Sequence, residues 1–199
     1  MIRIIDYKAG NAPCVMYAVT RLGYKAAFAR TPQDIADAKH IILPGVGSAK
    51  ATMDSLREMA LTDALADSVL RQKTPFLGIC VGMQILFEHS EEENADCFGW
   101  LKGRVVKFDA SKVRVPQMGW NRVRFVKNTP CHAREDYFYF VNSYYARPED
   151  TSDLWGTADY DGPFTAAICR DNIFATQFHV EKSGEAGLVL LDGFLSNRF

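Results

Sequence analysis

The sequence predicts an α/β fold, with an open, three-layer, mostly parallel sheet, helices on both faces, and added antiparallel strands in the C-terminal half. Up to residue 87, short apolar runs alternate with segments of helical periodicity, a pattern that indicates parallel strands joined by right-handed helical crossovers. Beyond residue 90, strand-like segments follow one another with few helical patterns between them, which is typical of antiparallel hairpins.

The first half of the chain alternates expected strands and helices. Asn11 is the expected N-cap of the first helix, Pro13 suits its first turn, and Gly23 suits the position after its end. In such a sheet, functional residues gather at the carboxyl ends of the strands. The expected strands cover residues 2–5, 25–29, 40–43 and 74–77, and the expected helices cover 12–22, 31–35, 53–70 and the segment after residue 80.

The second half is expected to be rich in strands and to close with an amphipathic helix over residues 184–195. Asp171 and Asn172 form the expected turn between the last two strands. We see no internal repeat, low-complexity tract or linker, so residues 1–199 are expected to form a single domain. The expected strands cover residues 104–108, 121–126, 137–141, 154–160, 165–170 and 173–178.

Composition limits the possible partners and cofactors. With 48% hydrophobic residues, 24% charged residues and a formal net charge of −1, the chain has no overall attraction to nucleic acid or membrane. It has neither a signal-peptide pattern nor an apolar run of roughly 18 residues, so a cytoplasmic location is expected. The five cysteines are odd in number and form no CxxC pair, which argues against disulfides and a zinc site. We expect no metal and no cofactor.

A cysteine stands where the sequence predicts a sharp strand-to-helix turn. The segment GICVGMQ at residues 78–84 follows an apolar strand and precedes apolar residues at helical spacing, so Cys80 falls at the apex. Gly78 and Gly82 flank it and permit close backbone approach. A helix that begins after Cys80 would favour its thiolate form. This segment alone is equally compatible with a buried structural cysteine.

A base and an oxyanion-binding loop are also expected at strand ends. His179 follows an alternating strand, and Glu181 stands two residues further on, where a carboxylate can fix the imidazole tautomer. Taken alone, this pair is more often an exposed histidine beside an exposed glutamate. The glycine-bounded loop Gly45-Val46-Gly47 can aim backbone N–H groups at an oxyanion, and Val81 supplies another candidate N–H. A phosphate-binding turn is the alternative for that loop.

Together these segments resemble a known family. PGVG at residues 44–47, GICVGMQ at 78–84 and HVEKS at 179–183 look like the oxyanion strand, nucleophile elbow and His/Glu pair of the class I (triad) glutamine amidotransferases. DYKAGN at 6–11 and PQMGWN at 116–121 are similar to motifs of one branch, the glutaminase subunits of imidazole glycerol phosphate synthases in histidine biosynthesis. The match in motif order and spacing extends along essentially the whole chain.

The resemblance implies a glutaminase with a Cys-His-Glu triad. Cys80 would attack the carboxamide of glutamine, His179 would carry the proton to the departing ammonia, and Glu181 would orient His179. An oxyanion hole is implied at Gly45, Val46 and Val81, and glutamine binding at Gln84, Glu92, Ser143 and Tyr144.

The resemblance also implies a protein partner, a (β/α)8 synthase subunit that receives the ammonia and forms a heterodimer with this chain. Spacing alone would instead make the Met and Trp of PQMGWN ordinary core residues of a hairpin. The family usually has glycine where Lys8 stands and proline where Val180 stands, which leaves activation by the partner open. The positions that match the family's partner-facing residues are Asn11, Pro116, Met118, Trp120 and Lys182.

Two other functions are compatible with parts of this pattern. A glutaminase of the pyridoxal phosphate synthesis type would share the triad, but PQMGWN argues against it. A binding or redox-sensing module would use the same turn without turnover. Basic residues alternate with valines in the second half, as in an oligonucleotide platform, yet a half-buried strand gives the same alternation and the net charge is slightly negative.

Overall fold

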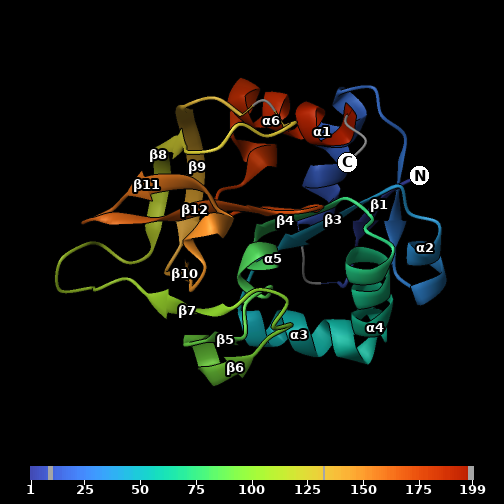
Figure 1. Cartoon of the computed structure of the whole chain (residues 1–199), viewed down its shortest axis with the longest axis horizontal. Helices are drawn as coiled ribbons and strands as arrows, with labels where there is room; N and C mark the ends of the chain where they lie inside the picture. The colour runs from blue at the N-terminus through green and yellow to red at the C-terminus, as the bar shows by residue number, and fades with distance from the viewer. Residues whose placement is uncertain (9–10, 132, 197–199) are drawn as a thin grey trace.

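The computed structural model describes residues 1–8, 11–131 and 133–196, and Figure 1 shows a large central sheet with helices above and below it. Its nine strands lie in the order β2-β1-β3-β4-β13-β12-β11-β8-β9. In chain order they span Ile2–Ile5 (β1), Ala26–Ala29 (β2), His40–Gly45 (β3), Phe76–Cys80 (β4), Gln117–Phe125 (β8), Asp136–Asn142 (β9), Leu154–Asp159 (β11), Pro163–Arg170 (β12) and Ile173–Thr176 (β13).

The sheet has two halves with different strand directions. From β2 to β13 all neighbours are parallel, and from β13 to β9 all are antiparallel. The predicted α/β class with added antiparallel strands is therefore confirmed. β3 and β4 end side by side, with Gly45 opposite Cys80, and β13 ends next to them, with Thr176 opposite Ile79. This register gathers the ends of three strands at one edge of the sheet.

The helices cover both faces of the parallel half. In Figure 1, α1 and α6 lie on one face, while α3, α4 and α5 lie on the other. Among the described residues, no helix is long and apolar enough to cross a membrane. The helices span Ala12–Arg21 (α1), Pro32–Ala36 (α2), Ala49–Glu58 (α3), Leu61–Ala66 (α4), Val81–Gln84 (α5) and Gly184–Ser196 (α6).

Two helix predictions need correction. The helix expected over residues 53–70 is broken after Glu58, because Ala60 adopts a left-handed conformation (φ +55°), and its last turn at Asp67–Arg71 is a wider π-helical turn. The apolar periodicity continues across the break because α3 and α4 bury their apolar residues in the same core. The helix expected after Cys80 is the single turn α5, and residues 85–87 are buried without continuing it.

A small second sheet was largely missed by the sequence prediction. Only β7 (Gly103–Lys107) was expected, and it lies between β10 (Tyr144–Pro148) and the two-residue strands β5 (His89–Ser90) and β6 (Ala95–Asp96). These partners are short, and β10 ends in proline, so no alternating pattern marks them. Strand β8 also begins at Gln117 instead of 121, which places most of PQMGWN in the strand.

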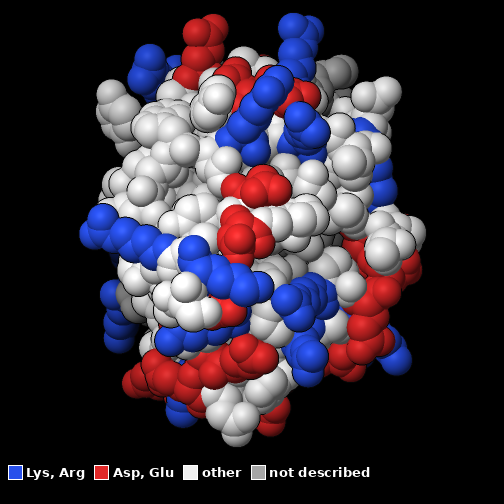
Figure 2. Space-filling view, turned by 90° about the vertical axis from the view of Figure 1, so that its left-hand side faces the viewer, with Lys and Arg blue, Asp and Glu red and all other residues white. Residues whose placement is uncertain are grey.

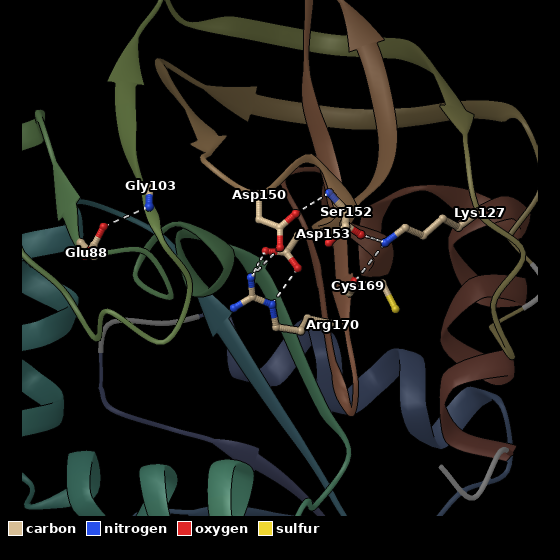
Figure 3. A network of polar contacts seen from close by, with 8 residues as sticks. All are labelled: Glu88, Gly103, Lys127, Asp150, Ser152, Asp153, Cys169 and Arg170. Atoms are coloured by element: carbon tan, nitrogen blue, oxygen red, sulfur yellow. Dashed lines mark hydrogen bonds and ion pairs between the residues drawn. The ribbon is translucent and has the colours of Figure 1, made fainter.

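An ion pair between the half-buried Arg170 and the buried Asp153 links parts of the antiparallel half (Figure 3). The Asp153 side chain is 3% exposed, and Arg170 donates to its two oxygens from Nε at 2.7 Å and Nη2 at 2.5 Å. Asp150 lies 3.7 Å from the same guanidinium. Nearby, Lys127 donates to the carbonyls of Ser152 and Cys169. These contacts tie the turn before β11 to the end of β12.

Acidic and basic side chains are interspersed on the face that Figure 2 shows, which views the left-hand side of Figure 1. Neither sign of charge dominates this face. This distribution fits the small net charge of −1 and gives the basic residues of the second half no continuous track for a phosphate backbone.

Candidate active site

A cleft of about 310 Å³ opens where β3, β4 and β13 end. It brings together most of the residues singled out in the sequence, from six separate stretches of the chain. Gly45 lies behind its lining, paired with Cys80 in the sheet. The predicted residues that line the cleft are Val46, Cys80, Val81, Gln84, Glu92, Pro116, Ser143, Tyr144, His179 and Lys182.

Cys80 occupies the strained turn that the glycine spacing predicts. It ends β4 with φ +56° and ψ −110°, a backbone conformation that residues other than glycine rarely adopt. A Cβ on Gly78 would lie 2.5 Å from the Gly82 carbonyl oxygen, and a Cβ on Gly45 would lie 2.5 Å from the Gly82 nitrogen. Glycine is therefore required on both sides of the turn. Because α5 is a single turn, its dipole places less positive potential near the sulfur than the longer helix expected from the sequence would.

His179 and Glu181 form a buried pair beside Cys80. The His179 Nδ1 lies 2.8 Å from the Glu181 Oε1, and their side chains are 3% and 0% exposed. Burial lowers the pKa of His179, but hydrogen bonds to the Cys80 and Glu181 side chains outweigh that effect and raise the pKa to about 10. The expectation that this could be an exposed pair is therefore wrong. The arrangement holds a protonated imidazole next to the sulfur at neutral pH.

The predicted N-cap Asn11 has a different use. It stands at the N-cap position of α1, but its side chain makes no cap bond and instead donates from Nδ2 to the Glu181 Oε1 at 2.6 Å. The preceding motif places Lys8 at φ +70°, a region that glycine enters without strain. Residues 9 and 10 of that motif, and His132, lie outside the described residues.

Burial keeps three of the other cysteines in the thiol form. It raises the pKa of Cys131 to about 12 and the pKa values of Cys97 and Cys169 to about 11, so these three remain thiols at neutral pH. Cys14 is exposed on α1. Among the described cysteines, Cys80 alone is paired with an imidazole, so it has the surroundings of a nucleophile.

The expected oxyanion donors lie next to the sulfur. Val46 follows Gly45 directly, and Val81 opens α5. The Val46 main chain also contacts the hydroxyl of Tyr7. Burial of this phenol raises its pKa, and the contact with Val46 offsets part of that rise. Donation from Val46 and Val81 to an oxyanion stays a prediction.

The expected glutamine-binding residues form the walls of the cleft. Gln84 is 3% exposed and donates from Nε2 to the Tyr144 carbonyl at 3.1 Å. Glu92 accepts a hydrogen bond from the Ala49 amide at 3.1 Å, and burial raises the pKa of its carboxyl. Their part in binding glutamine stays a prediction.

Gln177 is a residue of the site that the sequence prediction missed. It is completely buried and donates from Nε2 to the Cys80 Sγ at 3.6 Å. The available signal was a large polar residue near the end of the expected last strand, two positions before His179.

Four of the residues expected to face a partner lie in the cleft lining or beside it: Pro116 and Lys182 line the cleft, and Met118 and Trp120, on β8, follow Pro116 in the chain. Met118 and Trp120 are 66% and 56% exposed, so the alternative that they belong to the core is wrong. On β9, Val141 and Tyr139 lie opposite them in register. Because Val141 lines the cleft together with Pro116 and Lys182, this surface is continuous with the cleft.

Comparison with known proteins agrees with this arrangement. The sequence model of the family "Glutamine amidotransferase class-I" matches residues 3–196. The fold resembles a solved structure described as a glutamine amidotransferase (TM-score 0.79, 17% identity, covering 98% of this chain and 97% of that one). It also resembles PurLQS from Thermotoga maritima (TM-score 0.78, 19% identity, with the same coverage). The chain belongs to the class-I glutamine amidotransferase family.

Full-length relatives give its place within that family. The chain is 42% identical to the imidazole glycerol phosphate synthase subunit HisH of Leptospira interrogans, covering 98% of this chain and 100% of the relative. It is 40% identical to the subunit of that name from Neisseria meningitidis MC58, covering 97% and 98%. The chain thus falls among the imidazole glycerol phosphate synthase subunits HisH, and the resemblance stated from its motifs is confirmed.

Proposed function

We propose that this glutamine amidotransferase subunit hydrolyses glutamine through Cys80, His179 and Glu181 and supplies the ammonia to a synthase subunit in histidine biosynthesis. The observation that carries the proposal is the buried contact of His179 with both Cys80 and Glu181. A thiol beside an imidazole that is held by a carboxylate is the arrangement that activates a sulfur nucleophile at neutral pH.

In the first half of the reaction, the Cys80 sulfur attacks the side-chain carbonyl carbon of glutamine. The carbonyl π electrons move to oxygen, and the N–H groups of Val46 and Val81 are the proposed donors to that oxyanion. When the tetrahedral intermediate collapses, the C–N bond breaks and the nitrogen takes a proton from His179, releasing ammonia and leaving a glutamyl thioester on Cys80.

In the second half, water hydrolyses the thioester. His179, now neutral, removes a proton from the water as it attacks the thioester carbon. Collapse of this second intermediate breaks the C–S bond, releases glutamate and restores the thiolate and imidazolium pair. Glu181 keeps Nδ1 occupied throughout, so Nε2 is the nitrogen that faces the reacting atoms.

The partner is proposed to be a (β/α)8 synthase subunit that binds over the mouth of the cleft. The exposed Met118 and Trp120 suit an interface, because Trp is enriched among the residues that contribute most to binding and Met adapts its shape to a partner. Pro116 and Lys182 join that surface to the cleft, which fits direct transfer of ammonia from one subunit to the other. The cytoplasmic location and the single-domain organisation expected from the sequence remain predictions.

Labelling with a diazo-ketone analogue of glutamine tests the proposal. We expect one covalent adduct on Cys80 in mass spectrometry, increased by the synthase subunit and its ligand, and none on Cys80→Ala. That variant should lose glutamine-dependent synthesis, while the complex keeps its reaction with added ammonium salt. Absence of the adduct with the partner and ligand present would refute the glutaminase function, and loss of both reactions would indicate a structural role for Cys80.

A further inference from the structure

We propose that Gln177 is a positioning residue of the glutaminase, which donates a hydrogen bond to the Cys80 sulfur and fixes which atom of Gln84 faces the substrate. The inference rests on the proposed function. It concerns a buried amide that belongs neither to the Cys-His-Glu triad nor to the expected glutamine-binding residues.

Gln177 is the middle of a chain of hydrogen bonds between the nucleophile and the wall of the cleft. Its Nε2 donates to the Cys80 Sγ at 3.6 Å, and its Oε1 accepts from the Gln84 Nε2 at 3.0 Å. The same Gln84 nitrogen donates to the Tyr144 carbonyl at 3.1 Å. The Gln177 main-chain N–H is fixed to the Ala166 carbonyl of β12 at 2.8 Å. The Gln177 backbone is therefore fixed by β12, and its side-chain amide is fixed by Gln84.

The network allows one orientation of the Gln177 amide. If its oxygen and nitrogen were exchanged, two NH₂ groups would face each other and a carbonyl oxygen would face the sulfur. The contact between the two NH₂ groups would be repulsive, as would a carbonyl oxygen against the Cys80 thiolate, and Gln177 is fully buried, so water could not relieve them. Gln177 must therefore present an N–H donor to Cys80.

The donor has a chemical consequence at the sulfur. A hydrogen bond to a charged group favours the charged form, so the N–H of Gln177 favours the thiolate over the thiol. It also holds the sulfur on the side of His179, which is the geometry that the attack on a carboxamide requires. Loss of this bond should slow every reaction of the thiolate, with substrate or with a simple alkylating agent.

A second consequence concerns Gln84. Because its two N–H groups are taken by Tyr144 and Gln177, the Oε1 is the part of its amide left to contact a ligand. An amide oxygen recognises donors, such as the ammonium or carboxamide N–H groups of glutamine. Gln177 and the Tyr144 carbonyl together determine that Gln84 acts on the substrate as an acceptor, and the loss of Gln177 should weaken glutamine binding as well.

The two effects are separated by two variants. Gln177→Met has a similar volume and loses both bonds, so we expect about tenfold slower alkylation of Cys80 by iodoacetamide at pH 7 and a several-fold higher KM for glutamine. Gln177→Glu retains an oxygen that accepts from Gln84 but places a carboxylate beside the sulfur. It should keep KM within about threefold of the wild type and slow alkylation about tenfold at pH 8, with the alkylation pH profile moved upward.

Asn172→Leu is the matched control for stability. Asn172 is a buried amide in the turn before the same strand, and it donates to the carbonyls of Val69 and Thr74, away from the cleft. This variant should lower the melting temperature without changing the alkylation profile or KM.

Alkylation rates and KM within threefold of the wild type for Gln177→Met, or for Gln177→Glu if the first variant does not fold, would overturn the role of Gln177. That outcome leaves the proposed function intact, provided the wild type is labelled by the diazo-ketone analogue. A wild type that is not labelled would overturn the proposed function and this inference together.

Discussion

Gly45→Ala should force the end of β3 away from the turn that holds Cys80. The new Cβ would lie 2.5 Å from the Gly82 nitrogen and 2.6 Å from the Val81 Cβ, whereas real Cβ atoms keep at least 3.0 Å. The two segments must then separate by at least 0.5 Å, from 2.5 to 3.0 Å. No rotamer change relieves the contact, because the Gly82 atom is part of the backbone.

The displacement sets the expected size of the effect. A misplacement of about 1 Å can cost about a hundredfold in rate, so half of that predicts about a tenfold loss of kcat. Overpacking of this kind costs about 1–3 kcal/mol. For a chain of this length, that cost lowers the melting temperature by about 2–12 °C.

The assay is glutamine hydrolysis by the complex, measured together with a thermal melt. Gly23→Ala is the control, because Gly23 has φ +85° and a Cβ added there would meet no atom within 4 Å. This control variant should have a free energy of unfolding about 1–2 kcal/mol lower than the wild type, because of backbone strain, and an unchanged kcat. A Gly45→Ala variant with the kcat and melting temperature of the wild type would refute the interlocked packing of β3 against the turn.

Further substitutions test the charges and the exposed surface. Glu181→Gln should lower the pKa of His179 from about 10. In the wild type the imidazolium stabilises the fold below pH 6.5, and this contribution is lost as the pH rises toward 10. Urea unfolding of the variant should therefore show a lower free energy of unfolding at low pH and a smaller decrease of that free energy between pH 6.5 and 10. Arg170→Met leaves the buried Asp153 carboxylate unpaired, which should cost about 3 kcal/mol in urea unfolding, with part of the loss recovered when Asp153→Asn is added. An undiminished stability would show that the pair contributes nothing. Trp120→Ala should change stability by less than about 0.5 kcal/mol, since the side chain is 56% exposed, yet weaken binding of the synthase subunit more than about tenfold in calorimetry; unchanged affinity would place the interface elsewhere.

Local patterns predicted much of the framework. The strand over residues 2–5 and the turn at Asp171 and Asn172 match the structure, because a short apolar run and turn chemistry depend on neighbours in the chain. The break at Ala60 was invisible, since a left-handed alanine has no sequence signal and apolar periodicity continues across it. Strand β10 was missed because it owes its place to pairing with β7.

In the site, too, local sequence patterns indicated some residues, and the tertiary structure decided the contacts between distant ones. Local pattern singled out Cys80 within its glycine-flanked turn, and His179 with Glu181 after a strand, as candidates, because each signal lies within a few residues. The resemblance to a known family then made them the expected triad. Tertiary structure decided that Asn11 donates to Glu181 and that Gln177 contacts Cys80, since these pairs are 170 and 97 residues apart. The order of strands in the sheet decides which distant segments come into contact. Local sequence patterns do not encode which polar groups of those segments become hydrogen-bond partners. The same reason explains why exposure of Trp120 could be determined only from the folded chain, where its side chain remains 56% exposed on β8.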